Sequence, residues 1–276
     1  MGKIMSERLV TRPFLKWAGN KYRLLDRIRP LLTPGKRLIE PFAGSGALFL
    51  NTDYRLNVLN DNNADLINIY TSLQDEADGF IDYVEQFFVA KNNNETAYYR
   101  LRKKFNNTDD PYLKAALFIY MNRHGYNGLC RYNNSGGFNV PFGRYKQPYF
   151  PRQEMQYFAK RSQQARFTNE SFLKTMRKAR RGDVVYCDPP YVPLTSTANF
   201  TSYSAGGFGE AEQLALAEQA QKLAARGVSV IISNHDTPFT KEAYRDAVCT
   251  HFKVRRTISC KGTRRGYAGE LLACYG

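Results

Sequence analysis

The chain has 276 residues, enough to bury one large core or a core with an inserted domain. Its 40 Lys and Arg against 25 Asp and Glu give a formal charge of +15, which favours a polyanionic partner over an acidic small molecule. No apolar run reaches the roughly 18 residues of a membrane-spanning helix, and residues 1–10 lack the apolar stretch of a signal peptide. We therefore expect a cytoplasmic protein with no membrane partner.

The first predicted strand, residues 37–40, enters a glycine-rich turn at residues 41–46 and is followed by helical signal. Glycines let the backbone approach a ligand closely, so a nucleoside cofactor can lie over this turn. The turn lacks the third glycine of a dinucleotide fingerprint and the Lys-Ser/Thr of a phosphate loop. A second strand, residues 56–59, ends at Asn60 and Asp61, where such folds bind ribose hydroxyls; a solvated turn residue is the alternative for Asp61.

The alternation of strand and helix is interrupted from residue 64 to residue 151. Apolar residues at helical spacing predict three amphipathic helices, over residues 66–73, 80–88 and 98–105. Asp110 and Pro111 are typical of a helix N-cap and first turn, and apolar residues follow them at a spacing of four. These features predict a small helical subdomain.

The exit of that subdomain, residues 128–149, contains Asn and Gly at 133–137 between aromatic and polar residues, which predicts a β-hairpin with a long tip. Its side chains can stack, hydrogen-bond to base edges or neutralise phosphate. An exposed hairpin whose aromatic residues pack on the helices is the alternative. We expect an inserted helical and β-hairpin domain over 64–151 and a second domain made of 1–63 and 152–276.

The run of residues 184–187 predicts a buried strand, and Asp188-Pro189-Pro190-Tyr191 follows it directly. Open α/β sheets bind ligands just beyond the carboxyl ends of their strands, and two prolines stiffen the backbone there. A carboxylate and a carbonyl can then face one small planar group, such as an exocyclic amine. An Asp-Pro turn is the alternative, but the second proline and the tyrosine favour an active site in which Asp188, Pro189 and Tyr191 are catalytic.

Strands around Leu38, Val58, Val184 and Val230 alternate with helical stretches, which predicts an α/β fold with a parallel, doubly wound sheet. Five cysteines show no Cys-x-x-Cys spacing and the three histidines are far apart, so we expect reduced thiols and no metal. No Pro-Cys dipeptide occurs, which argues against the covalent cysteine route of cytosine-C5 methyltransferases. We interpret His235 as a hydrogen-bonded residue at the end of a strand.

Three of these motifs resemble a known family. Residues 14–21, 40–46 and 188–191 are similar to S-adenosylmethionine-dependent DNA adenine-N6 methyltransferases of the alpha group. Residues 126–133 and 138–145 narrow the resemblance to the Dam methyltransferases, which modify the adenine of GATC. The resemblance runs from about Phe14 to the C-terminus, through residues 197–201 and 233–237, and departs at Asn20, where the family usually has a second glycine.

The resemblance implies a Rossmann-like methyltransferase fold, in which residues 64–151 are an inserted target-recognition domain and residues 1–63 and 152–276 the catalytic domain. It also implies S-adenosylmethionine as the cofactor and transfer to a flipped-out adenine in double-stranded DNA. It implies cofactor binding by Trp17, Lys21, Phe42, Gly44, Gly46, Asp61 and Asp188. We also expect a monomer associated with the nucleoid.

The resemblance also assigns DNA contacts residue by residue. Lys16 matches the reader of the first guanine, and Arg131 matches the reader of the guanine paired to the last cytosine. The remaining matches are Leu129 and Pro141 to the thymine methyl, Tyr126 as a wedge in the base stack, Asn127 to the orphaned thymine, and Arg144 and Lys146 to phosphates, with Tyr145 between them. Arg suits guanine because its fork meets O6 and N7 together.

Two other classes of function remain open from sequence. A protein or small-molecule N-methyltransferase can use a similar Pro-Pro-aromatic pocket, but has no use for an aromatic and basic hairpin. A noncatalytic DNA-binding relative is expected to lose Asp188 or the glycine-rich turn, and this chain keeps both.

Overall fold

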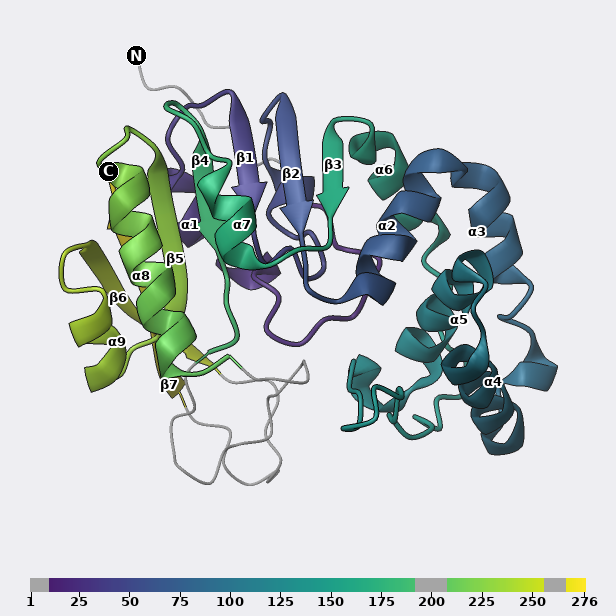
Figure 1. Ribbon diagram of the computed structural model, residues 1–276. Helices are drawn as coiled ribbons and strands as arrows, with labels where there is room; N and C mark the ends of the chain where they lie inside the picture. Colours follow the sequence, from purple (N-terminus) through teal and green to yellow (C-terminus); the bar gives the residue numbers. More distant parts are fainter. Residues whose placement is uncertain (1–9, 192–207, 256–266) are drawn as a thin grey trace, which may run out of the picture.

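The computed structural model describes residues 10–191, 208–255 and 267–276, and is built around a seven-stranded sheet of order β3-β2-β1-β4-β5-β7-β6 (Figure 1). The strands are β1 Arg37–Glu40, β2 Leu56–Asn60, β3 Ala165–Thr168, β4 Val184–Cys187, β5 Ser229–His235, β6 Val248–Arg255 and β7 Tyr267–Tyr275. β1 to β5 pair in parallel, whereas β7 runs antiparallel to both β5 and β6. The predicted α/β fold is confirmed, and its four predicted strands are β1, β2, β4 and β5.

Strand order reverses between β1 and β4, because the chain builds outward through β2 and β3 on one side and through β5 on the other. Ligands bind open α/β sheets at such a switch point. The glycine-rich turn follows β1 and Asp188 follows β4, so the topology brings these two distant motifs to the same edge of the sheet.

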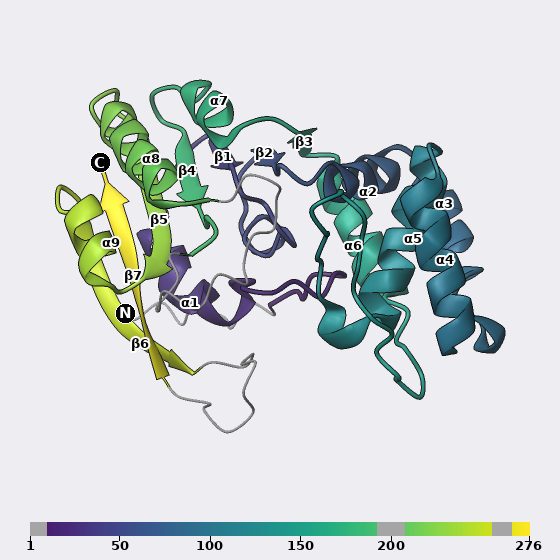
Figure 2. The same ribbon diagram turned by 60° about the horizontal axis from the view of Figure 1, so that its bottom comes forward.

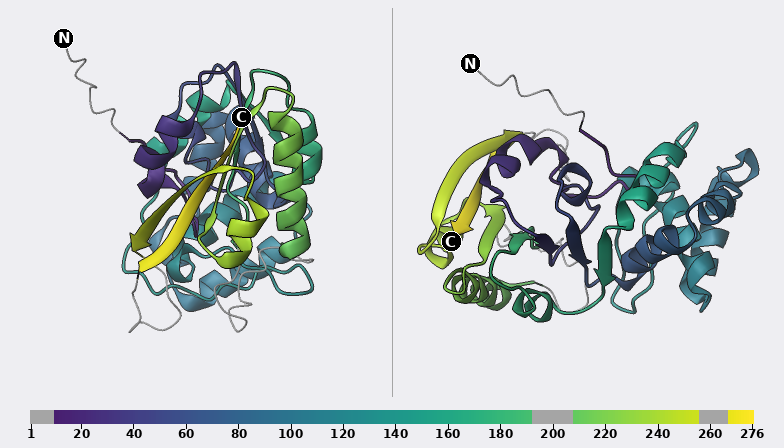
Figure 3. Two further views of the ribbon diagram at one scale, coloured as in Figure 1. Left: turned by 90° about the vertical axis from the view of Figure 1, so that its left-hand side faces the viewer. Right: turned by 90° about the horizontal axis from the view of Figure 1, so that it is seen from above.

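Both faces of the central strands are buried. Leu38, Val184, Tyr186 and Ile231 pack with Leu25 and Ile28 of α1, while their neighbours Ile39, Val185, Cys187 and Ile232 pack with apolar residues of α8. Successive side chains of a strand point to opposite faces, so a continuous apolar run fits a strand covered on both sides. Figures 2 and 3 show α1 on one face of the sheet and α7 and α8 on the other. The flanking helices are α1 Leu25–Ile28, α7 Phe172–Arg177, α8 Glu210–Ala224 and α9 Pro238–Ala243, with 3-10 turns at Tyr22–Leu24, Arg29–Leu31 and Phe49–Asn51.

The helical subdomain lies beyond the β3 edge of the sheet (Figure 1). Its elements are α2 Ala64–Asp75, α3 Ala77–Glu85, α4 Glu95–Asn107 and α5 Pro111–His124, with 3-10 turns at Ala90–Asn92 and Tyr126–Gly128. Helix α6, Arg152–Ser162, follows the subdomain and packs against α2 and α3. The predicted helices are confirmed, and Asp110 caps α5 by accepting from the backbone N–H groups of Tyr112 and Leu113. No helix among the described residues is long and apolar enough to cross a membrane.

The predicted helix after Asp110 is α5, and most of it is buried on every side. Every residue from Ala115 to His124 is buried, because α2, α3 and α4 all pack against it. A helix buried on all sides needs no polar face. The polar residues near its C-terminal end are therefore inside the protein: Asn122, Arg123 and His124 are all buried.

The predicted hairpin after α5 is an antiparallel loop joined by two isolated bridges, Gly125 to Phe142 and Tyr132 to Phe138, rather than by a continuous ladder. Side chains of α4 take the place of ladder partners. Asn106 donates to the Phe138 carbonyl and accepts from the Phe138 N–H, while Tyr98 and Arg102 both donate to the Val140 carbonyl. The loop is thus held to α4 by its backbone.

Candidate active site and nucleic-acid interface

Asp188 lies at the carboxyl end of β4, between side chains from two other parts of the chain. Lys21 Nζ donates to Asp188 Oδ2 at 2.8 Å and lies 2.6 Å from Oδ1. Ser233, on the neighbouring strand β5, donates to Oδ1 at 3.1 Å. Burial raises the pKa of Asp188, and Lys21 and Ser233 act against that rise by stabilising the ionised form. The carboxylate is therefore held by two donors at the switch point of the sheet.

Lys21 also connects Asp188 to Tyr191. Its ammonium donates to the Gly19 carbonyl at 2.6 Å and lies 4.6 Å from the centre of the Tyr191 ring. The ring meets His235 edge to face, with centroids 4.7 Å apart. Lys21, expected as a cofactor ligand, thus contacts Asp188 and Tyr191, two of the three predicted catalytic residues.

The glycine-rich turn after β1 forms a cradle with Asp61 and Trp17. Gly44 adopts φ +48°, its N–H donates to Asp61 Oδ2 at 3.0 Å, and its carbonyl accepts from the Tyr70 hydroxyl. A Cβ at position 44 would lie 2.9 Å from Trp17 Nε1, so only glycine lets the indole approach this closely. Because β1 and β2 are parallel neighbours, the turn and Asp61 meet at one edge of the sheet.

Phe42 and Gly46, two further predicted cofactor residues, face apolar side chains. Gly46 has φ +68°, and a Cβ there would meet Phe158 at 3.5 Å. Phe42 stacks on Phe172 with centroids 5.3 Å apart and meets Phe208 edge to face. The structure therefore gives both residues packing contacts, and their cofactor role stays a prediction.

Glu40 and Ser233 lie at the site, although no role was predicted for either; they belong to segments 40–46 and 233–237, which carry the resemblance. Glu40 ends β1 and is buried, and its Oε1 has no hydrogen-bond partner among the described residues. Burial raises the pKa of Glu40 to about 8, with a smaller contribution from the charge of Asp188. The sequence signal that could have identified Glu40 and Ser233 is their position, at the end of β1 and two residues before the end of β5, where open α/β sheets bind ligands. Together with Asp61 and Asp188, Glu40 makes an acceptor-rich site that suits a cationic ligand carrying hydrogen-bond donors.

Asn20 stands where the resembled family usually has a second glycine, and the segment 14–21 accommodates it without strain. Asn20 has no positive φ, its Oδ1 accepts from the Tyr22 N–H at 3.2 Å, and its Nδ2 donates to the Trp17 carbonyl at 3.1 Å. The bend itself is made by Gly19, with φ +76°. A second glycine is therefore unnecessary at position 20.

Lys16, next to Trp17, joins the predicted DNA-contacting loop. Asn122 of α5 accepts from the Lys16 N–H at 2.9 Å and donates to its carbonyl at 2.7 Å. The Lys16 ammonium lies 4.5 Å from the centre of the Tyr145 ring, and the Tyr145 hydroxyl accepts from the Asn127 N–H at 3.0 Å. Burial and the charge of Arg123 lower the pKa of Lys16. The structure thus brings Lys16, Asn127 and Tyr145 together.

Tyr126 projects from the start of this loop. Its side chain is 52% exposed, although its N–H is fixed to the Pro141 carbonyl at 2.8 Å. Asn127 follows with φ +54°, a left-handed conformation that Asn tolerates better than most residues. Leu129 is partly buried against the helical core. An exposed aromatic ring on an anchored backbone is suited to insertion between bases.

Three cationic residues are spread along the rest of the loop. Arg131 donates from Nε to Asn139 Oδ1 at 2.7 Å, which fixes the plane of its guanidinium. Arg144 adopts φ +55° and pairs with Glu95 at 3.2 Å, with both side chains largely exposed. Lys146 is exposed. The contacts of these three residues with DNA stay a prediction.

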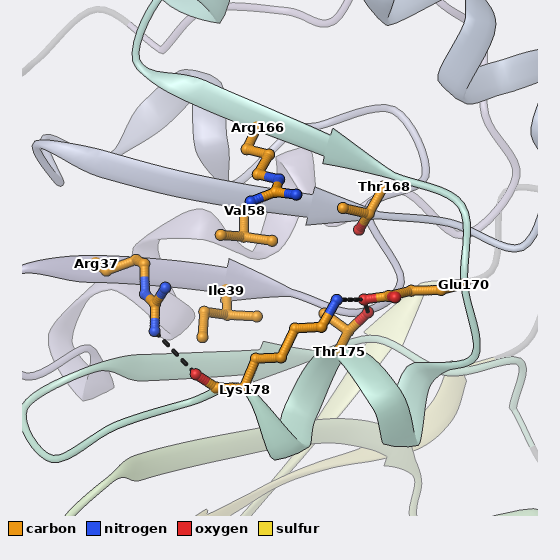
Figure 4. A pocket seen from close by; sticks show the side chains of 8 residues that line it. All are labelled: Arg37, Ile39, Val58, Arg166, Thr168, Glu170, Thr175 and Lys178. Carbon is orange, nitrogen blue, oxygen red and sulfur yellow. Dashed lines mark hydrogen bonds and ion pairs between the residues drawn. The ribbon is translucent and has the colours of Figure 1, made fainter.

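A separate cavity of about 190 Å³ lies between β1–β3 and α7 and contains none of the predicted site residues (Figure 4). Arg37, Arg166 and Lys178 line it, but Lys178 donates to Glu170 and Arg37 donates to the Lys178 carbonyl at 3.1 Å.

Within the described ranges, no group of three or more His, Cys, Asp and Glu is placed to hold a metal. Of the segments that carry the resemblance, residues 197–201 lie outside the described part of the chain.

Comparison with known proteins gives one consistent result. The family model described as D12 class N6 adenine-specific DNA methyltransferase matches residues 17–258. A Vibrio cholerae protein named DNA adenine methylase is 50% identical over 265 residues, covering 96% of each chain. Proteins of the same name from Escherichia coli K12 and Serratia marcescens are 50% and 51% identical, each over 96% of this chain and over 95% and 98% of their own lengths.

Proposed function

Because the chain belongs to the D12 class of N6 adenine-specific DNA methyltransferases, we propose that it methylates the adenine of GATC sites in double-stranded DNA. It is a DNA adenine methyltransferase, and its methyl donor is S-adenosylmethionine. The observation that carries the proposal is that Asp188, directly after β4, and the Gly44 turn, directly after β1, both lie at the switch point of the sheet.

 The opening segment, residues 14–21, connects this edge of the sheet to the loop after α5. Lys21 Nζ donates to Asp188 Oδ2 at 2.8 Å, and the Lys16 ammonium lies 4.5 Å from the centre of the Tyr145 ring.

S-adenosylmethionine fits the acceptor-rich site. The cofactor carries an ammonium group, a sulfonium and ribose hydroxyls, and it supplies an activated methyl group when bound. The unpartnered Oε1 of buried Glu40 and the carboxylate of Asp61 are acceptors for such donors. Trp17 and Gly44 form the wall of the cradle. We assign Trp17, Lys21, Phe42, Gly44, Gly46 and Asp61 to cofactor binding on this support and on the family resemblance.

Asp188 and Pro189 would activate the adenine amino group. Its nitrogen lone pair is delocalised into the ring, which makes it a poor nucleophile. If the Asp188 carboxylate and the Pro189 carbonyl accept the two amino hydrogens, they favour a pyramidal nitrogen whose lone pair points at the methyl group. Asp188 must be ionised for this role, and Lys21 and Ser233 favour its ionised form.

The target base has to leave the duplex to reach this pocket, which costs a few kcal/mol of unstacking. Tyr191 would stack on the flipped adenine. Tyr126 would fill the gap in the helix and recover part of the cost, while Asn127 would meet the orphaned thymine. Exposure of Tyr126 on a fixed backbone supports this division of roles.

Recognition of the site would divide between base edges and backbone. Lys16 and Arg131 would read the two guanines, Leu129 and Pro141 would contact the thymine methyl, and Arg144, Tyr145 and Lys146 would contact the DNA backbone. In this proposal residues 64–151 form the recognition domain and residues 1–63 and 152–276 the catalytic domain. The enzyme would act as a monomer, in the cytoplasm and associated with the nucleoid.

The test uses DNA from cells that express the protein and that lack GATC methylation of their own. Two nucleases that cut GATC but differ in sensitivity to adenine methylation should give opposite digestion patterns. Cells that express Asp188→Ala should return the pattern of unmethylated DNA. Unmethylated GATC in cells with well-folded wild-type protein would overturn the proposed target. Methylated adenine found only outside GATC would mean that the enzyme recognises a different sequence.

A further inference from the structure

A buried polar network lies behind the Asp188–Tyr191 segment. Gln213, in the first turns of α8, is fully buried, and its Nε2 donates to the Pro190 carbonyl at 2.9 Å. The two residues are 23 positions apart in the chain. A fully buried polar side chain bonded to the backbone of a proposed catalytic segment is a candidate for holding that segment in place.

Neighbouring residues fix the orientation of the Gln213 amide. Its Oε1 accepts from the Tyr244 hydroxyl at 2.8 Å and from Asn234 Nδ2 at 3.0 Å. Both partners are fully buried; Asn234 belongs to β5, and Tyr244 directly follows α9 as its C-cap. A carbonyl can only accept, so the amide nitrogen must be the atom that faces Pro190. The network therefore ties α8, β5 and α9 to one carbonyl of the segment.

The two prolines explain why this carbonyl matters. Neither Pro189 nor Pro190 has an N–H, so their backbone can be anchored only through carbonyl oxygens. Lys21 and Ser233 hold the segment at Asp188, and Gln213 holds it at Pro190. The proline rings restrict φ at both positions. The peptide between Pro189 and Pro190 is therefore held from both ends, which leaves the Pro189 carbonyl with a defined direction.

We propose that Gln213 is a positioning residue for methyl transfer, which keeps the Pro189 carbonyl aimed at the adenine amino group by holding the Pro190 carbonyl behind it. The inference rests on the proposed function, because it needs the Pro189 carbonyl as an acceptor. A misplacement of about 1 Å at a reacting group can lower a rate by about 10². Loss of the Gln213 donor should therefore lower the methyl-transfer step without weakening the binding of either substrate.

The decisive variant is Gln213→Glu, which keeps the size of the side chain and makes its donor titratable. A neutral carboxyl can donate to the Pro190 carbonyl, whereas a carboxylate is repelled by it. The Tyr244 hydroxyl, which donates to Gln213 Oε1, is an ionisable partner of this side chain, and burial raises the pKa of Tyr244. We expect the single-turnover rate of Gln213→Glu to fall as the pH rises through neutrality, at saturating cofactor and DNA. The wild-type rate should not fall over that range.

Two further variants complete the design. Gln213→Met removes the donor at every pH, so its single-turnover rate should be at least about tenfold below wild type with no added pH dependence. Tyr244→Phe removes one donor to Oε1 but leaves the bond to Pro190, so it should keep the wild-type pH profile. Cofactor affinity and DNA affinity should stay within about twofold of wild type in all three variants.

The outcomes separate this inference from the proposed function. Wild-type protein that does not methylate adenine would overturn the proposed function itself. Active wild type together with a wild-type rate in Gln213→Met would overturn only the positioning role. Loss of cofactor binding in parallel with rate, in both Gln213 variants, would assign the network to the stability of the fold and would also overturn it.

Discussion

At the scale of single residues, the proposed chemistry depends on the half-buried carboxylate of Asp188, which must stay ionised. Burial raises the pKa of Asp188, and Lys21 and Ser233 act in the opposite direction. The rate should therefore fall as the pH drops through the pKa of Asp188. This acid limb should lie at higher pH than an exposed aspartate would give.

Ser233→Ala should move that acid limb further toward higher pH. The hydroxyl donates to the ionised carboxylate, so its removal favours the protonated form and raises the pKa of Asp188. The measurement is the pH profile of single-turnover methyl transfer. Ser229→Ala, on the same strand but without a bond to Asp188, is the matched control. An unmoved acid limb in Ser233→Ala would mean that Asp188 is not the group that titrates.

Base reading can be separated from catalysis at Arg131. Its guanidinium is fixed by Asn139, and a fork of this kind can bond O6 and N7 of one guanine. Arg131→Ala should cost about 1–3 kcal/mol of discrimination at one base pair of GATC. Single-base variants of the site measure the loss. Arg144→Ala, on the same loop, should weaken all duplexes alike; the same uniform loss in Arg131→Ala would remove its assignment as a reader.

At the scale of elements, the turn after β1 is the part whose shape is most restricted. Gly44→Ala would combine a strained φ of +48° with a Cβ 2.9 Å from Trp17 Nε1. We expect the indole to be displaced and the affinity for S-adenosylmethionine to fall at least about tenfold. Equilibrium binding measures the effect. Gly136→Ala is the control, because it has φ +76° with nothing within 4 Å of the added Cβ, and so adds strain without a collision.

Strands buried on both faces could be predicted, because their residues form continuous apolar runs in the sequence. β4, with Val184, Val185, Tyr186 and Cys187 all buried, is an example. β3 escaped prediction because its four residues include Arg166 and Thr168 and none is fully buried. The long β6 and β7, which are consecutive and pair antiparallel, were missed; from Val248 to Val254 β6 has only exposed and half-buried residues, so it lacks the apolar run of a strand covered on both faces.

The same limit applies to the site. Asp188 and the glycine-rich turn could be found from motifs, because each follows a recognisable strand. The hydrogen bonds that Lys21 and Ser233 donate to Asp188 could not, since these residues are 167 and 45 positions away from it. Pairing of this kind is set by strand order rather than by local sequence. The loop after α5 was predicted as a hairpin, but the side chains of α4 that replace its ladder were not foreseeable from the loop alone.

At the scale of the whole molecule, the formal charge of +15 predicts binding to DNA that weakens steeply with salt. Lys146→Ala should reduce the slope of log affinity against log salt by about 1 if Lys146 contacts a phosphate. Lys222→Ala removes the same charge from α8, where the side chain pairs with Glu218, and serves as the control. Equal slopes in the two variants would mean that Lys146 contributes only to the net charge.

The hydrogen bonds between Asn122 and Lys16 have a consequence for exchanging parts between homologues. Lys16 precedes the proposed recognition domain by 48 residues of sequence, yet its backbone is clamped by α5, and Arg123 donates to the nearby Phe14 carbonyl. A graft cut at residues 64 and 151 would therefore transplant one guanine reader and leave the other behind. A chimera intended to change sequence preference has to carry residues 14–17 together with the helices that hold them.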